Sequence, residues 1–158
     1  MQTKDVTVSG RKYRIEQMVP LMAGRVKGWL WSASIKFARD DRGQTAPAES
    51  RSLTPAELQE LAEGSVKYAW SIAPSSISEE ACEKIQRYAL QQCKYFDAST
   101  QAPCDLLVGN TIADAALKDD GPGIDELIVH SLQFSVSPFF SKELAERLNP
   151  AAPKATVN

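Results

Sequence analysis

Residues 3–37 read TKDVTVSGRKYRIEQMVPLMAGRVKGWLWSASIKF, and the spacing of their apolar residues changes at Pro20. Before Pro20, apolar and polar residues alternate on both sides of Ser9-Gly10. Two short alternating runs joined by a glycine turn predict a β-hairpin within residues 3–18. An isolated hairpin is barely stable in water, so its apolar face must rest on another element. The residues of that face are Val6, Val8, Tyr13 and Ile15.

After the hairpin, apolar residues recur at three- and four-residue intervals, which predicts a helix to about Arg39. Its main apolar line comprises Met22, Val26, Trp29, Leu30, Ala33 and Phe37, and a second line comprises Leu21, Trp31 and Ile35. Gly24 and Gly28 leave room for another backbone, and each costs about 1 kcal/mol relative to alanine inside a helix. Two interpretations stay open: a central core helix, or a helix on which Trp31 and Ile35 form part of a partner's binding surface.

Further helices are predicted after a polar, flexible connection at 40–52. The clearest start is Thr54-Pro55-Ala56-Glu57, which combines a threonine N-cap, a proline at the first helical position and the glutamate of a capping box. Ser76-Ile77-Ser78-Glu79 repeats the capping pattern, and Asp119-Asp120-Gly121-Pro122-Gly123 is a strong stop. The predicted segments are 55–74, 79–96, an apolar stretch through 106–117, 124–137 and a short helix after Ser141.

The predicted fold class is therefore mainly α: a small assembly of about five helices with an N-terminal β-hairpin. A chain of 158 residues with 43% hydrophobic content suits one domain. We place that domain at 1–148, with the hairpin at 3–18, the helical part at 20–148 and a flexible C-terminal tail at 149–158.

Charge and hydropathy argue against two classes of partner. The formal net charge is -2 and the acidic and basic residues are interspersed, so the cationic surface that binds nucleic acid is absent from the sequence. No apolar run approaches the roughly 20 residues that cross a bilayer. The N-terminal residues MQTKDVTVSG are polar where a signal peptide is apolar. We therefore expect a cytoplasmic protein that binds neither nucleic acid nor membrane.

The sequence has no recognisable catalytic, metal or cofactor motif, and we expect a binding protein that is not an enzyme. Cys82, Cys93 and Cys104 are odd in number and widely spaced, which favours reduced, buried thiols. Cys82 and Cys93 lie eleven residues apart, so both are expected on one side of the third helix. His130 is the only histidine and has no partner motif. Acidic pairs such as Asp119-Asp120 are expected at helix ends and turns.

Two segments carry a resemblance to a known family. The hairpin KDVTVSGRKYRI at 4–15 and the segment LQFSVSPFF at 132–140 resemble tail assembly chaperones of long-tailed bacteriophages. The resemblance implies a chaperone in the bacterial host cytoplasm whose copies cover the apolar stripes of the helical tape measure protein until tail-tube subunits polymerise around it. The tape measure protein is then the main partner, with the tail-tube protein as a second, and a homo-oligomer is compatible with this role.

Such a chaperone needs exposed apolar surface on a rigid helical scaffold to receive partner helices. The candidate contact residues are Trp29, Trp31, Ile35, Phe134, Phe139 and Phe140, each of which has core packing as its alternative. Two other functions stay open. One is a minor tail or connector protein of a phage particle, and the other is a small phage regulatory or host-interaction protein.

Overall fold

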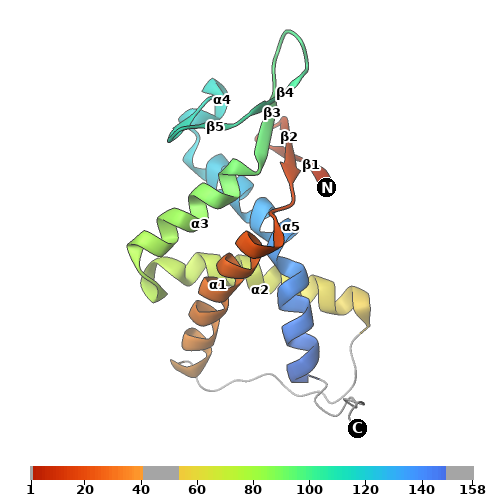
Figure 1. The fold of residues 1–158 in the computed structure, drawn as a ribbon, viewed down its shortest axis with the longest axis vertical. Coiled ribbons are helices and arrows are strands. Elements are labelled where there is room, and N and C mark those ends of the chain that lie inside the picture. Colours follow the sequence, from red (N-terminus) through yellow and green to blue (C-terminus); the bar gives the residue numbers. More distant parts are fainter. Residues whose placement is uncertain (1, 41–53, 149–158) are drawn as a thin grey trace.

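A computed structural model describes residues 2–40 and 54–148, with the side chains of 34–40 and 147–148 excepted. The predicted connection at 40–52, apart from Asp40, and the predicted tail at 149–158 lie outside the described residues. In chain order the elements are β1 (Thr3–Val8), β2 (Arg11–Glu16), α1 (Pro20–Asp40), α2 (Pro55–Ser76), α3 (Glu79–Gln91), β3 (Cys93–Phe96), β4 (Pro103–Asp105), β5 (Leu107–Val108), β6 (Thr111–Ile112), α4 (Ala115–Lys118) and α5 (Gly121–Leu148). The chain is mainly α with a small antiparallel sheet, which confirms the predicted fold class (Figure 1).

The N-terminal hairpin forms where the alternation predicts it. Val8 pairs with Arg11 across a two-residue turn, and Ser9 and Gly10 both take positive φ angles, 52° and 79°. This backbone conformation matches the right-handed twist of the strands it joins. The apolar face is buried, as predicted, with Tyr13 and Ile15 among its most enclosed side chains.

The sheet is larger than the sequence predicts. Its order is β1-β2-β3-β4, and residues 93–96 form β3 instead of the end of a helix (Figure 1). Cys93 pairs with Ile15 and Tyr95 with Tyr13, so the prediction that Cys93 shares a helix face with Cys82 is wrong. The edge of β2 supplies hydrogen-bond partners for a segment whose Cys, Tyr and Phe side chains suit a pleated surface.

The apolar stretch at 106–117 is mostly extended, which corrects its assignment to the helical part. β5 and β6 form a small hairpin around Gly109-Asn110, with Gly109 at a φ of 65°. Only one helical turn, α4, follows, and Asp114 caps it by accepting a hydrogen bond from the Ala116 N–H. The glycine-asparagine pair is a turn signal that outweighs the apolar spacing around it.

The starts of α2 and α3 are confirmed. Thr54 accepts a hydrogen bond from the Glu57 N–H at 3.1 Å while the Glu57 carboxylate accepts one from the Thr54 N–H at 2.8 Å. Ser78 caps α3 in the same sense. The predicted end of α2 near Pro74 is two residues early, because the helix continues through Pro74 to Ser76.

The long helix α5 starts earlier and ends later than predicted, because it begins at Gly121 and passes Pro138 without ending. Proline lacks the N–H that would bond the carbonyl four residues earlier. That carbonyl, of Phe134, accepts a hydrogen bond from Gln17 Nε2 at 3.3 Å, and the Ser135 hydroxyl accepts one from the Met18 N–H at 2.9 Å. The connection between β2 and α1 is therefore fastened to α5 where its helical hydrogen bonding is interrupted.

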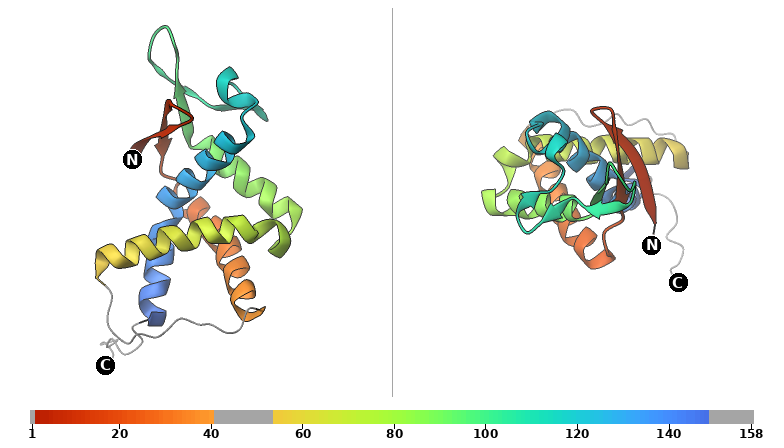
Figure 2. Two further views of the ribbon diagram at one scale, coloured as in Figure 1. Left: turned by 180° about the vertical axis from the view of Figure 1, so that it is seen from behind. Right: turned by 90° about the horizontal axis from the view of Figure 1, so that it is seen from above.

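Helix α5 forms the centre of the molecule. It runs from the sheet to the far end, and α2 lies across both α5 and α1 (Figures 1 and 2). Small side chains on α2 allow this close crossing; they are Ala62, Val66, Ala69 and Ala73, all fully buried. The Trp70 indole N–H donates to Asp125 at 3.1 Å, so a hydrogen bond also joins α2 to α5.

Candidate partner-binding surface

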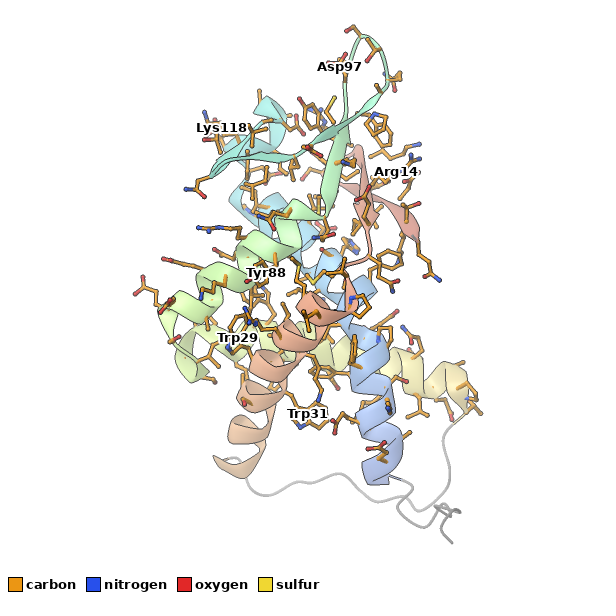
Figure 3. All side chains as sticks on the ribbon, viewed as in Figure 1. Arg14, Trp29, Trp31, Tyr88, Asp97 and Lys118 are labelled. Atoms are coloured by element: carbon orange, nitrogen blue, oxygen red, sulfur yellow. The ribbon has the colours of Figure 1, made fainter. Side chains whose placement is uncertain are left out.

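The two tryptophans of α1 point in different directions. Trp29 stacks on Tyr88 of α3, with ring centroids 6.5 Å apart, whereas Trp31 meets the ring of Phe140 on α5 edge-on at 5.0 Å (Figure 3). Residues two apart in a helix are separated by about 200°, so one flat contact surface cannot include both. The predicted set of contact residues is therefore divided between two sides of α1.

Phe140 lies in the core, with none of its surface exposed to solvent. In this structure a partner cannot reach Phe140, which corrects its placement on a contact surface. Phe134 and Phe139 are partly buried and pack against the core. The side chain of Ile35 lies outside the described residues, although its backbone belongs to α1.

Trp31 lies at the seam between α1 and α5. Beside it, Lys27 donates to Glu143 at 2.8 Å, and the Lys27 ammonium lies 5.6 Å from the centroid of the Trp31 ring. Both charged side chains are less than a third exposed. Trp31 is partly exposed and thus borders the solvent-facing side of α1. The seam is held by packing and an ion pair within the chain.

The solvent-facing side of α1 carries three uncharged residues that we call the α1 outer face: Leu21, Gly24 and Gly28. The exposed Arg25 lies beside them. Leu21 is 87% exposed, the largest exposure among the large apolar side chains described. A Cβ added to Gly24 or Gly28 would meet no atom within 4 Å apart from the helix's own nearby backbone. Neither glycine is needed for packing against another described part of this chain. The sequence indicated a second apolar line through Leu21, Trp31 and Ile35, with the two glycines beside it. In the structure Leu21 and the glycines are open, whereas Trp31 packs against Phe140.

The opposite side of α1 accounts for its packing in the fold. Ala23, Val26, Leu30 and Ala33 are fully or almost fully buried there. Their spacing of three and four residues produces a continuous apolar stripe. Met22, Trp29 and Trp31 extend this packing on either side of the stripe. The α1 outer face, in contrast, makes no internal contact that the described residues show.

The groups with potential chemistry are engaged in structural roles. Cys93 is buried, and desolvation raises the pKa of its thiol to about 12. Burial also raises the pKa of Cys82. His130 lies 3.7 Å from Glu126, one helical turn earlier on α5. Within residues 2–40 and 54–148, no three His, Cys, Asp or Glu side chains form a group suited to a metal ion.

A buried polar network ties the hairpin to α4. The Tyr13 hydroxyl donates to Asp114 at 2.7 Å, and the Arg11 guanidinium lies 3.1 Å from the same carboxylate. Burial and the neighbouring carboxylate raise the pKa of Tyr13 well above its ordinary value. A second tie joins the hairpin turn to the start of α5, where the Ser9 hydroxyl donates to Asp120 at 2.6 Å. These contacts orient the sheet on α5.

Sequence reasoning missed some exposed apolar groups. Leu61 on α2 is 42% exposed, and Val108 on the small β5–β6 hairpin is 61% exposed. Periodicity finds an apolar line but does not say which of two neighbouring lines the fold covers. For Val108, the only available signal was the turn that follows it.

Comparisons with known proteins found no family model, no curated protein and no solved structure that matches this chain. No helix in the described part of the chain is both long and apolar enough to cross a membrane.

Proposed function

We propose that this protein is a phage tail assembly chaperone that binds and shields the tape measure protein while the tail is built. The observation that carries the proposal is the α1 outer face, where an exposed leucine lies beside two helix-interior glycines that nothing in the described chain covers. The likeness of 4–15 and 132–140 to that family supports the same role.

A helix is the partner that suits this face. Glycines four residues apart allow two helices to approach closely, and Leu21 then packs beside the crossing point. Burying one leucine contributes about 1.5–3 kcal/mol, so such a contact is reversible unless it is repeated. Several copies along a long helical partner would give stable cover that subunit polymerisation can still displace.

The proposal is tested by producing the protein together with the tape measure candidate of its own genome. The wild type should co-purify with that partner and increase its soluble fraction. Leu21→Ala should reduce co-purification, whereas Val108→Ala, which removes an exposed apolar side chain far from α1, should not. Absence of co-purification together with unchanged solubility of the partner would contradict the proposal.

The glycines offer a sharper test because two effects have opposite signs. Gly24→Ala and Gly28→Ala should each stabilise the isolated chain by up to about 1 kcal/mol, since alanine is the better helix former and its Cβ meets open space. The same methyl groups should hold a partner helix away and reduce its capture. Gly64→Ala on α2 is the matched control, because its Cβ also meets open space. It should stabilise the chain without reducing capture.

Mass spectrometry of purified particles separates the proposal from a structural role. A chaperone is displaced and should be absent from the mature particle, whereas a minor tail or connector protein should be present in a fixed ratio. Expression apart from the morphogenesis genes would instead favour a regulatory or host-interaction protein.

A further inference from the structure

The outer side of α2 points away from the rest of the described molecule. Seen from behind, α2 runs across the molecule in front of α1 and α5, and its buried side faces these two helices (Figure 2). The opposite side carries a line of uncharged, exposed residues that we call the α2 outer face: Leu61, Gly64, Tyr68, Ser71 and Ser75.

Two large apolar side chains stand on the α2 outer face. Leu61 is 42% exposed and Tyr68 is 40% exposed. They are seven residues apart, about two helical turns, so both point to the same side of the helix. Among the described residues they are the only two exposed large apolar side chains on one helix. Gly64 lies between them, and a Cβ added there would meet no atom within 4 Å. A second helix can therefore approach closely at Gly64.

The serine hydroxyls of this face already have partners within their own helix. The Ser71 hydroxyl donates to the Tyr68 carbonyl at 2.7 Å, and the Ser75 hydroxyl donates to the Ile72 carbonyl at 3.1 Å. A buried hydroxyl without a partner would be costly, but these hydroxyls keep their hydrogen bonds when water is excluded. The α2 outer face can therefore be covered without leaving these donors unsatisfied.

Two opposite charges flank the α2 outer face. Glu60 and Lys67 are also seven residues apart, so they lie on the same flank of the line. Both are exposed, and within the part of the chain that the structure describes neither has an ion-pair partner. A partner that carries the opposite pattern would pair with both charges.

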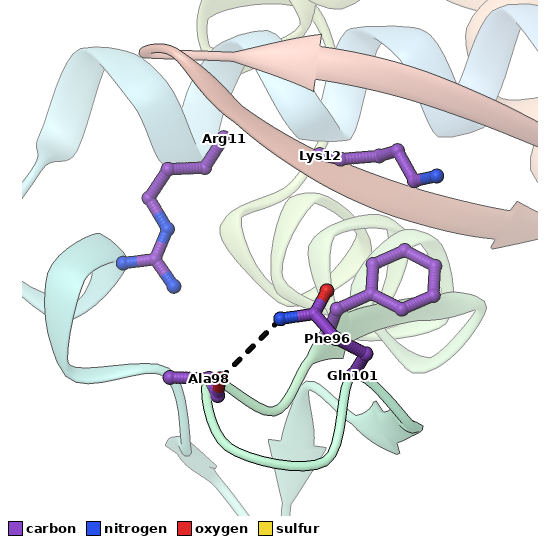
Figure 4. A pocket seen from close by; sticks show the side chains of 5 residues that line it. All are labelled: Arg11, Lys12, Phe96, Ala98 and Gln101. Carbon is purple, nitrogen blue, oxygen red and sulfur yellow. Dashed lines mark hydrogen bonds between the residues drawn. The ribbon is translucent and has the colours of Figure 1, made fainter.

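The cations beside the sheet differ, because they are already paired. A cavity of about 430 Å³ is found there, and its lining residues are Arg11, Lys12, Phe96, Ala98 and Gln101 (Figure 4). The Arg11 guanidinium lies 3.1 Å from the Asp114 carboxylate, and the Lys12 ammonium lies 3.7 Å from the Asp5 carboxylate. The charges on α2 are therefore better placed to select a partner than those of the cavity.

We propose that the α2 outer face binds a second copy of this chain, with the two α2 helices antiparallel about a two-fold axis at Gly64. Leu61 of each copy then packs on Tyr68 of the other, and the symmetry makes this contact twice. An antiparallel two-fold arrangement also brings the same flank of both helices together. Glu60 of each copy therefore faces Lys67 of the other, which forms two ion pairs between the copies.

Charge selects a second copy over other helical partners. A partner helix with charges of one sign along its flank would place a like charge against either Glu60 or Lys67. One helix per copy gives a contact of the small class, below about 1,200 Å², so the dimer should be weak and reversible. This inference does not rest on the proposed function, which concerns the α1 outer face.

The test is sedimentation velocity of the full-length chain across a concentration series from micromolar to millimolar. The wild type should change from monomer to dimer within this series. Glu60→Lys and Lys67→Glu should each weaken association about tenfold or more, because each places like charges opposite one another. The double variant Glu60→Lys/Lys67→Glu should regain wild-type association. An equimolar mixture of the two single variants should also associate, because every charge on the flank then faces its opposite.

Matched controls separate this pairing from a general effect of net charge. Glu83→Lys and Lys118→Glu make the same changes in net charge at exposed positions on α3 and α4. Neither should alter association, and their mixture should associate no better than the wild type. Leu61→Ala should weaken association, whereas Val108→Ala should not.

Two results would overturn the proposal: a wild type that stays monomeric throughout the series, or a double variant that associates no better than the single variants. Co-purification with the tape measure candidate tests the α1 outer face instead, so the two proposals can fail separately.

Discussion

The effects of substituting Pro138 and Gln17 on stability are predicted to depend on each other, although Pro138 lies in α5 and Gln17 precedes α1. Pro138 deprives the Phe134 carbonyl of its helical donor, and the Gln17 amide replaces that donor at 3.3 Å. This explanation of why α5 continues past a proline has a consequence for stability. The contribution of Gln17 to the free energy of unfolding must vanish when the proline is removed. A double-mutant cycle measures that dependence.

The magnitudes follow from the hydrogen bond and the helix. Gln17→Ala should lower the free energy of unfolding by about 1 kcal/mol, the net value of one partly buried hydrogen bond. Pro138→Ala restores an N–H and removes the clash of the ring with the preceding turn, and should raise that free energy by about 1–3 kcal/mol. In the Pro138→Ala background the new N–H donates to the Phe134 carbonyl. Gln17→Ala should then leave the free energy of unfolding almost unchanged. The expected coupling energy is about 1 kcal/mol.

The assay is urea denaturation of the wild type, both single variants and the double variant, followed by circular dichroism. Gln133→Ala is the matched control, because its amide donates to the Glu63 carbonyl at 3.0 Å, which Pro138 does not affect. Gln133→Ala should lower the free energy of unfolding by the same amount with and without Pro138. An equal cost of Gln17→Ala with and without Pro138 would refute the argument, as would a loss of stability in Pro138→Ala.

Three further outcomes are expected. Tyr13→Phe should cost about 1–2 kcal/mol in urea denaturation, because the buried carboxylate of Asp114 loses a donor; an unchanged midpoint would contradict this. Hydrogen bonds hold the pKa of Asp120 below its ordinary 3.8, so its stabilising effect is present above that pH and is lost as the pH falls through the lowered value. Asp120→Asn should therefore flatten the acid limb of the stability curve. With a thiol reagent at neutral pH, Cys104 should react well before buried Cys93, whose pKa is about 12; equal rates would show that the core opens readily.

The parts of the fold that were predictable depend on neighbours in sequence. The Thr54–Glu57 capping box and the Ser9-Gly10 turn each satisfy their hydrogen bonds within a few residues, so residue type alone indicates them. The alternation of β1 and β2 likewise fixes which face is buried. These elements formed where the pattern placed them.

The elements that were missed depend on partners far along the chain. Residues 93–96 become β3 because β2 offers an unpaired edge, and no local pattern records that edge. Pro138 is tolerated within α5 because Gln17 reaches the freed carbonyl from the other end of the sequence. The neighbouring sequence predicts how much a residue destabilises its helix or strand. Whether a distant residue offsets that destabilisation is decided by the folded chain.

The same reasoning separates the two kinds of candidate contact residue. Phe140 is large and apolar, which describes a core residue as well as a contact residue, and the fold buries it against Trp31. Gly24 and Gly28 are different because they weaken the helix that contains them, and the described fold offers nothing in return. When a costly residue has no compensation inside the chain, its reason is to be sought outside it. That asymmetry makes the α1 outer face a better candidate than any of the aromatic residues.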